Sequence, residues 1–219
     1  MDGATLQNRI WKGYAKAALR IGLKYQVIRP VGTATPLTSG NLVMSLYASF
    51  TPHSAAQFSF GKPSDYKDTM YHGLFDATST QVGDYLTGQQ GRFFVASLDP
   101  LMPTLCVQCN RTLTIKRAGS VSSPGISGTY SGDTASTEVV LAAGFPGSVV
   151  MRARGLSSSG STLPMDIGSG SYEVLLPAIP GVLPRPSDIV IDDLGRRFLV
   201  NTCEVSALGW RMHTYEAVA

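Results

Sequence analysis

The sequence predicts a mainly β protein, in which an N-terminal amphipathic α-helix is followed by two small, possibly duplicated β-barrel or β-sandwich modules. Three observations predict this fold class. One segment near the N-terminus has helical periodicity, the rest of the chain consists of short β-favouring runs separated by Gly and Pro, and several segments recur in the same order in the two halves. With 43% hydrophobic and 15% charged residues, the 219-residue chain has the composition of a folded protein.

The predicted helix covers residues 5–21 and, with its flanks, forms an N-terminal unit at residues 1–24. Its apolar residues at helical spacing are Leu6, Ile10, Tyr14, Ala18 and Ile21. Asp2 or Thr5 is suited to cap its start, and Gly22 stands where a left-handed residue commonly ends a helix. The helix is therefore expected to be amphipathic, with its basic residues mainly on the other sides.

The β-rich remainder divides at a polar segment. Residues 25–118 are predicted to form the first β module and residues 137–219 the second. Between them, residues 119–136 are rich in Gly, Ser and Thr, which is typical of a linker or a long polar connection.

Internal similarity predicts that the two modules are related. The hairpin that begins at Asp84 and returns through Gly91, Arg92 and Phe93 resembles the hairpin that begins at Asp188, with one residue more in the second. Two further pairs of segments keep the same order: residues 71–77 with 172–178, and 41–46 with 137–142. If the duplication is real, Asp84 and Asp188 should lie at equivalent strand starts, and Arg92 and Arg196 at equivalent turns.

Charge and cysteine content limit the classes of function. The net charge of +3 requires neither a nucleic-acid nor a membrane partner, and no run of apolar residues is long enough for a signal peptide or a membrane span. Three cysteines, an odd number, indicate reduced thiols rather than a secreted disulfide framework. We therefore expect a protein made in the cytoplasm, without a membrane partner.

The chain contains no recognisable catalytic motif. The Cys106–Cys109 pair has the spacing of zinc ligands, and Cys203 with one of His53, His72 or His213 would complete a tetrahedral site. Residues three apart on a strand point to opposite faces, so two structural thiols are the favoured interpretation. The serines lack a nucleophile elbow and the Gly-rich stretches lack the ending of a phosphate loop. The sequence thus predicts no enzyme, no cofactor and no metal.

The N-terminal segment holds the candidate partner-binding residues, Arg9, Lys12, Lys16 and Arg20. A cluster of this kind can face phosphates, an acidic protein or only solvent. The interpretation we favour for the fold is an ordinary amphipathic helix that covers one end of a β-barrel. Contact with a neighbouring subunit is kept as a hypothesis, and the sequence does not indicate whether DNA is involved.

Roughly the first half of the chain resembles a group of uncharacterised structural proteins from the tail-gene regions of tailed bacteriophages and prophages. The segments that carry the resemblance are Met1–Arg9, Ile28–Pro30, Asn41–Val43, Gly73–Asp76, Gln81–Leu86, Phe93–Leu98 and Leu105–Thr112. The resemblance implies a virion protein of the tail or baseplate, present in several copies around the tail axis and without catalytic residues. Its partners would be other tail proteins, such as the tail tube, the sheath or the hub.

Two alternatives to a tail or baseplate protein remain at this stage. One is a neck protein that completes the junction of head and tail. The other is a receptor- or carbohydrate-binding β protein, which would need aromatic residues clustered in exposed loops. Trp11 lies in the predicted helix and Trp210 in a predicted strand, so the tryptophans do not favour that alternative.

Overall fold

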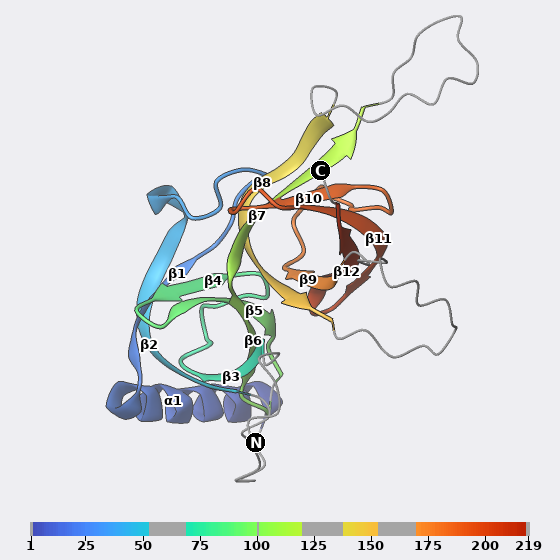
Figure 1. Cartoon of the computed structure of the whole chain (residues 1–219). Coiled ribbons are helices and arrows are strands. Elements are labelled where there is room, and N and C mark those ends of the chain that lie inside the picture. The colour runs from blue at the N-terminus through green and yellow to red at the C-terminus, as the bar shows by residue number, and fades with distance from the viewer. Residues whose placement is uncertain (1, 53–68, 100, 120–137, 153–169, 218–219) are drawn as a thin grey trace, which may run out of the picture.

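Two closed, antiparallel, six-stranded β-barrels lie side by side, with one long helix below the first (Figure 1). The computed structural model describes residues 2–52, 69–99, 101–119, 138–152 and 170–217. The mainly β fold with an N-terminal helix and two β modules, predicted from the sequence, is confirmed, and both modules are barrels.

Barrel 1 is closed in the strand order β1-β2-β3-β6-β5-β4. Its strands are β1 (Leu23–Ile28), β2 (Leu42–Pro52), β3 (Met70–Leu74), β4 (Tyr85–Gly88), β5 (Gly91–Ser97) and β6 (Thr104–Cys109). A short 3₁₀ helix, η1 (Ser39–Asn41), precedes β2. Alternate residues of the strands point inward and fill the barrel with a core that includes Tyr25, Leu86, Phe93 and Cys106.

Barrel 2 has the corresponding strand order, β7-β8-β9-β12-β11-β10. Its strands are β7 (Arg111–Ala118), β8 (Glu138–Met151), β9 (Ser171–Leu176), β10 (Ile189–Asp192), β11 (Arg197–Ser206) and β12 (Gly209–Glu216). Each strand of barrel 2 therefore corresponds to the strand six places earlier in the chain. Identical topology in two consecutive units is what a duplicated module would give.

The boundary between the modules differs from the one expected. Because β7 pairs with β8 and β10, residues 111–118 belong to barrel 2 and not to a first module at 25–118. The barrels meet at Asn110, with no linker between β6 and β7. Most of the expected linker at 119–136 lies outside the described residues, between two strands of the same barrel.

Strand register extends the similarity to single residues. In both barrels the ladder between the first two strands has a bulge at the same place, after Val27 and after Ile115. A second shared bulge follows Val95 in barrel 1 and Val200 in barrel 2. Bulges at matching positions make independent origin of the two barrels a poor explanation.

An arginine and an aspartate hold the same position in each barrel, and we call this pair the Arg–Asp clasp. In barrel 1, Arg29 donates from Nε and Nη2 to the two carboxylate oxygens of Asp84, both at 2.8 Å. In barrel 2, Arg117 makes the same two bonds to Asp188, at 2.7 and 2.8 Å. Each aspartate is almost fully buried and also accepts a backbone N–H three residues before it. The prediction that Asp84 and Asp188 occupy equivalent strand starts is confirmed.

The turns that follow correspond less closely than expected. Thr87 of β4 and Ile191 of β10 are equivalent, since each lies three residues after the aspartate of its clasp. Thr87 pairs with Arg92 and Ile191 pairs with Arg197, so Arg92 corresponds to Arg197 and not, as expected, to Arg196. The extra residue of barrel 2 lies in its turn, between β10 and β11. Residues 71–77 and 172–178 correspond as predicted. The predicted match of 41–46 with 137–142 pairs the correct strands, β2 and β8, but its register is wrong by two residues.

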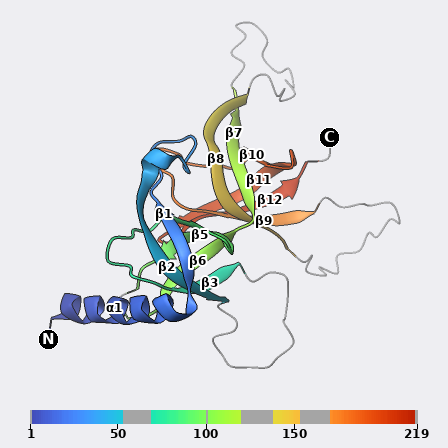
Figure 2. The ribbon, with the colours of Figure 1, turned by 90° about the vertical axis from the view of Figure 1, so that its left-hand side faces the viewer.

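Helix α1 (Gly3–Ile21) contacts β2 and β3 of barrel 1 and extends past the barrel at its N-terminal end (Figures 1 and 2). Ala18 is its one buried residue, and Trp11 packs partly against the core of barrel 1. Gly22 ends the helix, but its φ of −93° is not left-handed as expected. Glycine is needed there because a Cβ would lie 2.5 Å from the carbonyl oxygen of Ala48.

The barrels share an apolar interface. The outer face of β4, β5 and β6, with Tyr85, Phe94 and Val107, joins one continuous core cluster with residues of barrel 2. The Tyr85 hydroxyl donates to the carbonyl of Pro146 at 2.8 Å. The loop after β1 also reaches barrel 2, where Ala143 is bonded to the backbone on both sides of Ala34. The two barrels are thus packed together rather than loosely tethered.

Candidate functional site

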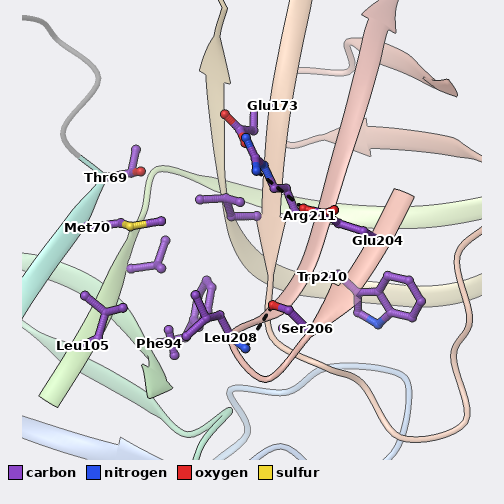
Figure 3. A pocket seen from close by; sticks show the side chains of 14 residues that line it. Thr69, Met70, Phe94, Leu105, Glu173, Glu204, Ser206, Leu208, Trp210 and Arg211 are labelled. Carbon is purple, nitrogen blue, oxygen red and sulfur yellow. Dashed lines mark hydrogen bonds and ion pairs between the residues drawn. The ribbon is translucent and has the colours of Figure 1, made fainter. Parts of the chain in front are cut away.

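A groove of about 440 Å³ lies between the two barrels (Figure 3). Barrel 1 contributes its outer wall, with Met70, Phe94 and Leu105 among the lining residues. Barrel 2 contributes β9 and the hairpin of β11 and β12, including Leu175 and Leu208. The volume is in the range of small-ligand sites, and the floor is apolar.

Charged side chains stand on the barrel 2 side of this groove. Arg211 donates to Glu173, and its Nη1 lies 3.5 Å from Glu204 (Figure 3). Arg152 approaches the other oxygen of Glu173 at 3.5 Å. Hydrogen bonding to Glu173 raises the pKa of the Arg211 guanidinium. These charges satisfy one another, so the rim offers little unpaired charge to a ligand.

The lining provides no evident chemistry. Among the groove's described residues there is no His, Cys or Lys, and the hydroxyl of Ser206 already accepts the backbone N–H of Leu208 at 3.2 Å. A general base must reach a nucleophile by a hydrogen bond, and the described residues that line this groove include no such pair. The groove is suited to holding apolar groups.

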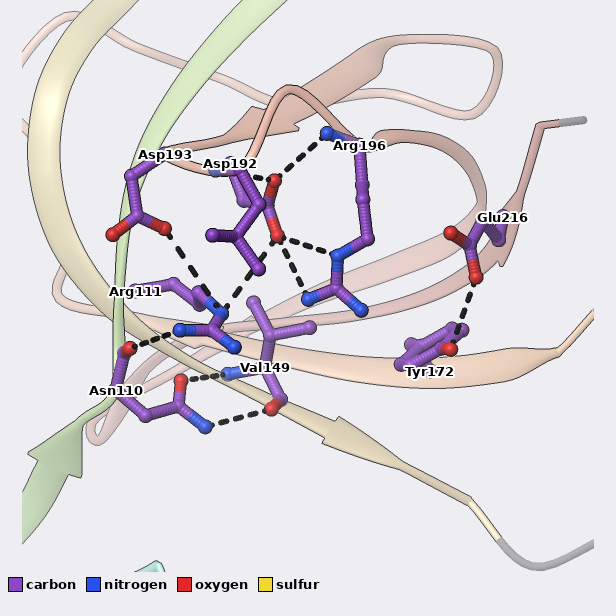
Figure 4. A network of polar contacts seen from close by, with 9 residues as sticks. Asn110, Arg111, Val149, Tyr172, Asp192, Asp193, Arg196 and Glu216 are labelled. Atoms are coloured by element: carbon purple, nitrogen blue, oxygen red, sulfur yellow. Dashed lines mark hydrogen bonds and ion pairs between the residues drawn. The ribbon is translucent and has the colours of Figure 1, made fainter. Parts of the chain in front are cut away.

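A buried carboxylate at the end of β10, that of Asp192, is the centre of a network of polar contacts (Figure 4). Asp192 accepts the backbone N–H groups of Leu194 and Arg196 and the Arg196 Nε, and Arg111 Nε lies 3.8 Å away. Beside it, the Asn110 side chain exchanges two hydrogen bonds with the backbone of Val149. Because the Asp192 carboxylate has a partner on every side, the network holds a turn and leaves no free group for proton transfer.

The three cysteines do not form one site. On β6, Cys106 points into the core of barrel 1 while Cys109 packs against the core cluster shared with barrel 2. Cys203 lies on β11, where its thiol donates to the carbonyl of Pro184. Burial raises the pKa of the Cys106 and Cys109 thiols, which disfavours the thiolate that a metal needs. Within the described residues, no group of three or more His, Cys, Asp or Glu side chains is placed to hold a metal ion.

The four candidate partner-binding residues fall on one side of α1. Arg9, Lys12, Lys16 and Arg20 are all exposed, and we call them the basic stripe. At 100° per residue they span an arc of about 80°. Trp11 and Ala18, which face the barrel, are on the opposite side of the helix.

Comparison with known proteins identifies no relative. No family model, no curated protein and no solved structure matches this chain. Among the helices of the described residues, none combines the length and apolar content needed to cross a bilayer. Arguments about function therefore depend on the surfaces of the molecule.

A face that sequence reasoning missed lies on barrel 2. By strand register, Leu199 corresponds to Phe94 and Tyr215 to Val107. Phe94 and Val107 are 1% and 3% exposed because they pack against barrel 2, whereas Leu199 and Tyr215 are each 45% exposed. We call Leu199 and Tyr215, which pair across β11 and β12, the open face. The internal repeat was visible in the sequence, but only the strand pairing of the two barrels shows that Leu199 and Tyr215 match Phe94 and Val107.

Proposed function

We propose that this protein is a structural component of a tailed-phage virion, in the tail or baseplate, which assembles through protein–protein contacts and has no catalytic role. In this proposal it is made in the cytoplasm of the bacterial host and is present in several copies around the tail axis. Its partners are other tail proteins, such as the tube, the sheath or the hub.

The observation that carries the assembly part of the proposal is the open face. The outer wall of barrel 1 is buried against a neighbouring barrel, while Leu199 and Tyr215 at the corresponding positions of barrel 2 are exposed. The buried centres of protein interfaces are more apolar than the rest of the surface, and Tyr is enriched in interfaces. Since barrel 1 packs against a neighbouring barrel through this face, the equivalent face of barrel 2 is suited to pack against another protein in the same way.

The phage assignment is supported by the sequence resemblance of the first half. The segments that carry it include the Gln81–Leu86 hairpin start and the β6 segment from Leu105, which now fall in barrel 1. Among the described residues of the groove, the lack of a hydrogen-bonded base and nucleophile is also consistent with assembly rather than catalysis. A neck protein would use the same surfaces, so the two positions in the virion must be distinguished by experiment.

Mass spectrometry of purified virions, with copy number measured against the tail-tube protein, tests this proposal. We expect the protein in mature particles at a stoichiometry that corresponds to a ring. Absence from mature particles would contradict the proposal and indicate an assembly factor or a cellular protein. A copy number matching the neck, together with its retention in tailless heads, would move it from the tail to the neck.

The open face is tested by a matched pair of substitutions. Leu199→Glu should reduce incorporation into particles, because it places a charge in the proposed contact. Leu194→Glu changes an equally apolar residue, 61% exposed in the turn before β11, and should leave incorporation unchanged. Circular dichroism of both purified variants checks that the fold is retained.

A further inference from the structure

The positive charge of the protein is concentrated in the helical segment. Residues 1–24 contain five Lys or Arg and one acid, a net +4, whereas residues 25–219 contain thirteen Lys or Arg and fourteen acids, a net −1. The excess charge is thus a property of one surface rather than of the whole molecule. Such a localised field attracts a partner of opposite charge.

The basic stripe is arranged for contact along a line. Its four residues are spaced over about 16 Å of helix at 1.5 Å per residue, on the side of α1 turned away from barrel 1. Thr5 also lies within this arc and is small, whereas Gly13 and Leu19 each lie about 20° beyond one of its two margins. Figures 1 and 2 show α1 at the outer end of barrel 1, on the side away from barrel 2.

A second copy of this chain is poorly suited to cover the stripe. Most acidic side chains in the described parts of both barrels, Asp193 and Glu204 included, already lie within 4.0 Å of an arginine or lysine nitrogen. In the same described parts, the acids that are exposed, Asp99, Asp193 and Glu204, lie on separate elements and form no matching row. The occupant is therefore expected to come from outside the chain.

We propose that the basic stripe binds the phosphate backbone of duplex DNA without sequence preference. A duplex carries one charge per about 1.7 Å of axis, so a 16 Å length of duplex carries on the order of ten phosphates, enough to offer one to each residue of the stripe. Protein interfaces usually centre on aromatic and apolar side chains, which the middle of this stripe lacks. Single-strand binding relies on stacked aromatics, and neither Trp11 nor Tyr14 lies in this sector. DNA contact goes beyond the proposed structural role and stands independently of it.

The test is fluorescence anisotropy of a labelled 20-base-pair duplex with the full-length protein over a range of salt concentrations. Four phosphate contacts predict a slope of log K against log salt of about −3 to −4. The double substitution Lys12→Gln with Lys16→Gln should make this slope shallower by about 2. The control, Arg92→Gln with Arg185→Gln, removes two exposed charges from the barrels and should leave the slope unchanged.

Three results would overturn the inference. They are no duplex binding by the unmodified protein at low salt, equal losses in the stripe and control variants, and displacement of the duplex by polyglutamate as effective as by unlabelled duplex at equal charge concentration. The last would assign the stripe to an acidic protein surface. Virion mass spectrometry is unaffected by these outcomes, so failure here is distinguishable from failure of the structural role.

Discussion

The two barrels share their framework and differ in their surfaces. Both have the same strand order, the same two bulges and the same Arg–Asp clasp. They differ at the turn after the fourth strand, where barrel 1 has Gly88 and barrel 2 has Asp192 at the equivalent position. The comparison indicates that closing the barrel depends on the clasp, while the turns were free to change.

The outer faces of the two barrels have diverged at equivalent positions. Ile28 of barrel 1 packs into the shared interface, whereas its counterpart Lys116 forms an ion pair with Glu138. Arg197, the counterpart of Arg92, also pairs with Glu138. Barrel 2 therefore has a charged outer edge where barrel 1 has an apolar contact. One duplicated face became an internal joint, and the other became a surface for solvent or a partner.

The largest expected effect comes from breaking the clasps. Asp84→Ala and Asp188→Ala should each lower the free energy of unfolding by about 3 kcal/mol, because each leaves an arginine and a backbone N–H without a buried partner. Urea denaturation followed by circular dichroism measures both. Asp99→Ala is the control, since Asp99 is exposed and caps a loop without pairing to arginine. A large loss in one barrel and a loss below about 0.5 kcal/mol in the other would show that the clasps are not equivalent.

Substitutions in the two turns should both reduce stability, but for different reasons. Asp192→Ala removes the carboxylate that accepts two backbone N–H groups and pairs with Arg196, and should lower the free energy of unfolding by about 2 kcal/mol.

Gly88→Ala in barrel 1 should lower the free energy of unfolding by a similar amount, about 1 to 3 kcal/mol, because the new Cβ would lie 2.6 Å from the Tyr25 ring. Gly40→Ala, where nothing lies within 4 Å, is the matched control. If Gly88→Ala is as stable as Gly40→Ala, the close contact is not a constraint.

A smaller effect is expected at the joint between the barrels. Tyr85→Phe removes the hydroxyl that donates to Pro146 and should reduce stability by about 1 kcal/mol. Tyr47→Phe removes a hydroxyl from an exposed side chain and should change nothing. The comparison is made by thermal unfolding at one protein concentration, and identical midpoints for the two variants would contradict the role given to this bond.

The smallest effect is a difference in acid sensitivity. Hydrogen bonding to Arg197 and Lys116 holds the pKa of Glu138 below its ordinary 4.5. A lowered carboxylate pKa gives stability that is complete above the unfolded value and is lost as the pH falls through the folded value. The stability advantage of the native protein over Glu138→Gln should therefore shrink below about pH 4.5. Urea titrations at pH 7 and at stepwise lower pH measure it, and a constant difference would contradict the assignment.

The duplication could be predicted from the sequence because the hairpins that begin at Asp84 and Asp188 have kept similar residues in the same order. It misplaced the module boundary because β7 looks like a continuation of the run that starts at Leu105, and a composition shift at residue 119 is more visible than a change of partner strand at Asn110. Pairing partners of a strand are non-local, so they are not encoded in its own residues.

The candidate sites were predicted unevenly for the same reason. Helical spacing was sufficient to find the basic residues of α1, whose arrangement on one face follows from 3.6 residues per turn. The groove and the open face depend on which strands of the two barrels approach each other. Leu199 and Tyr215 are ordinary strand residues in the sequence, and only comparison with Phe94 and Val107 gives their exposure a meaning.

Site-specific photo-crosslinking in assembling particles tests most directly whether the open face is a contact with another virion protein. A photoreactive phenylalanine analogue is placed at position 199 or 215, with position 194 as the control. The account predicts crosslinks from 199 and 215 to a second virion protein, and none above background from 194. Crosslinks at 199 and 215 no more frequent than at 194 would contradict it.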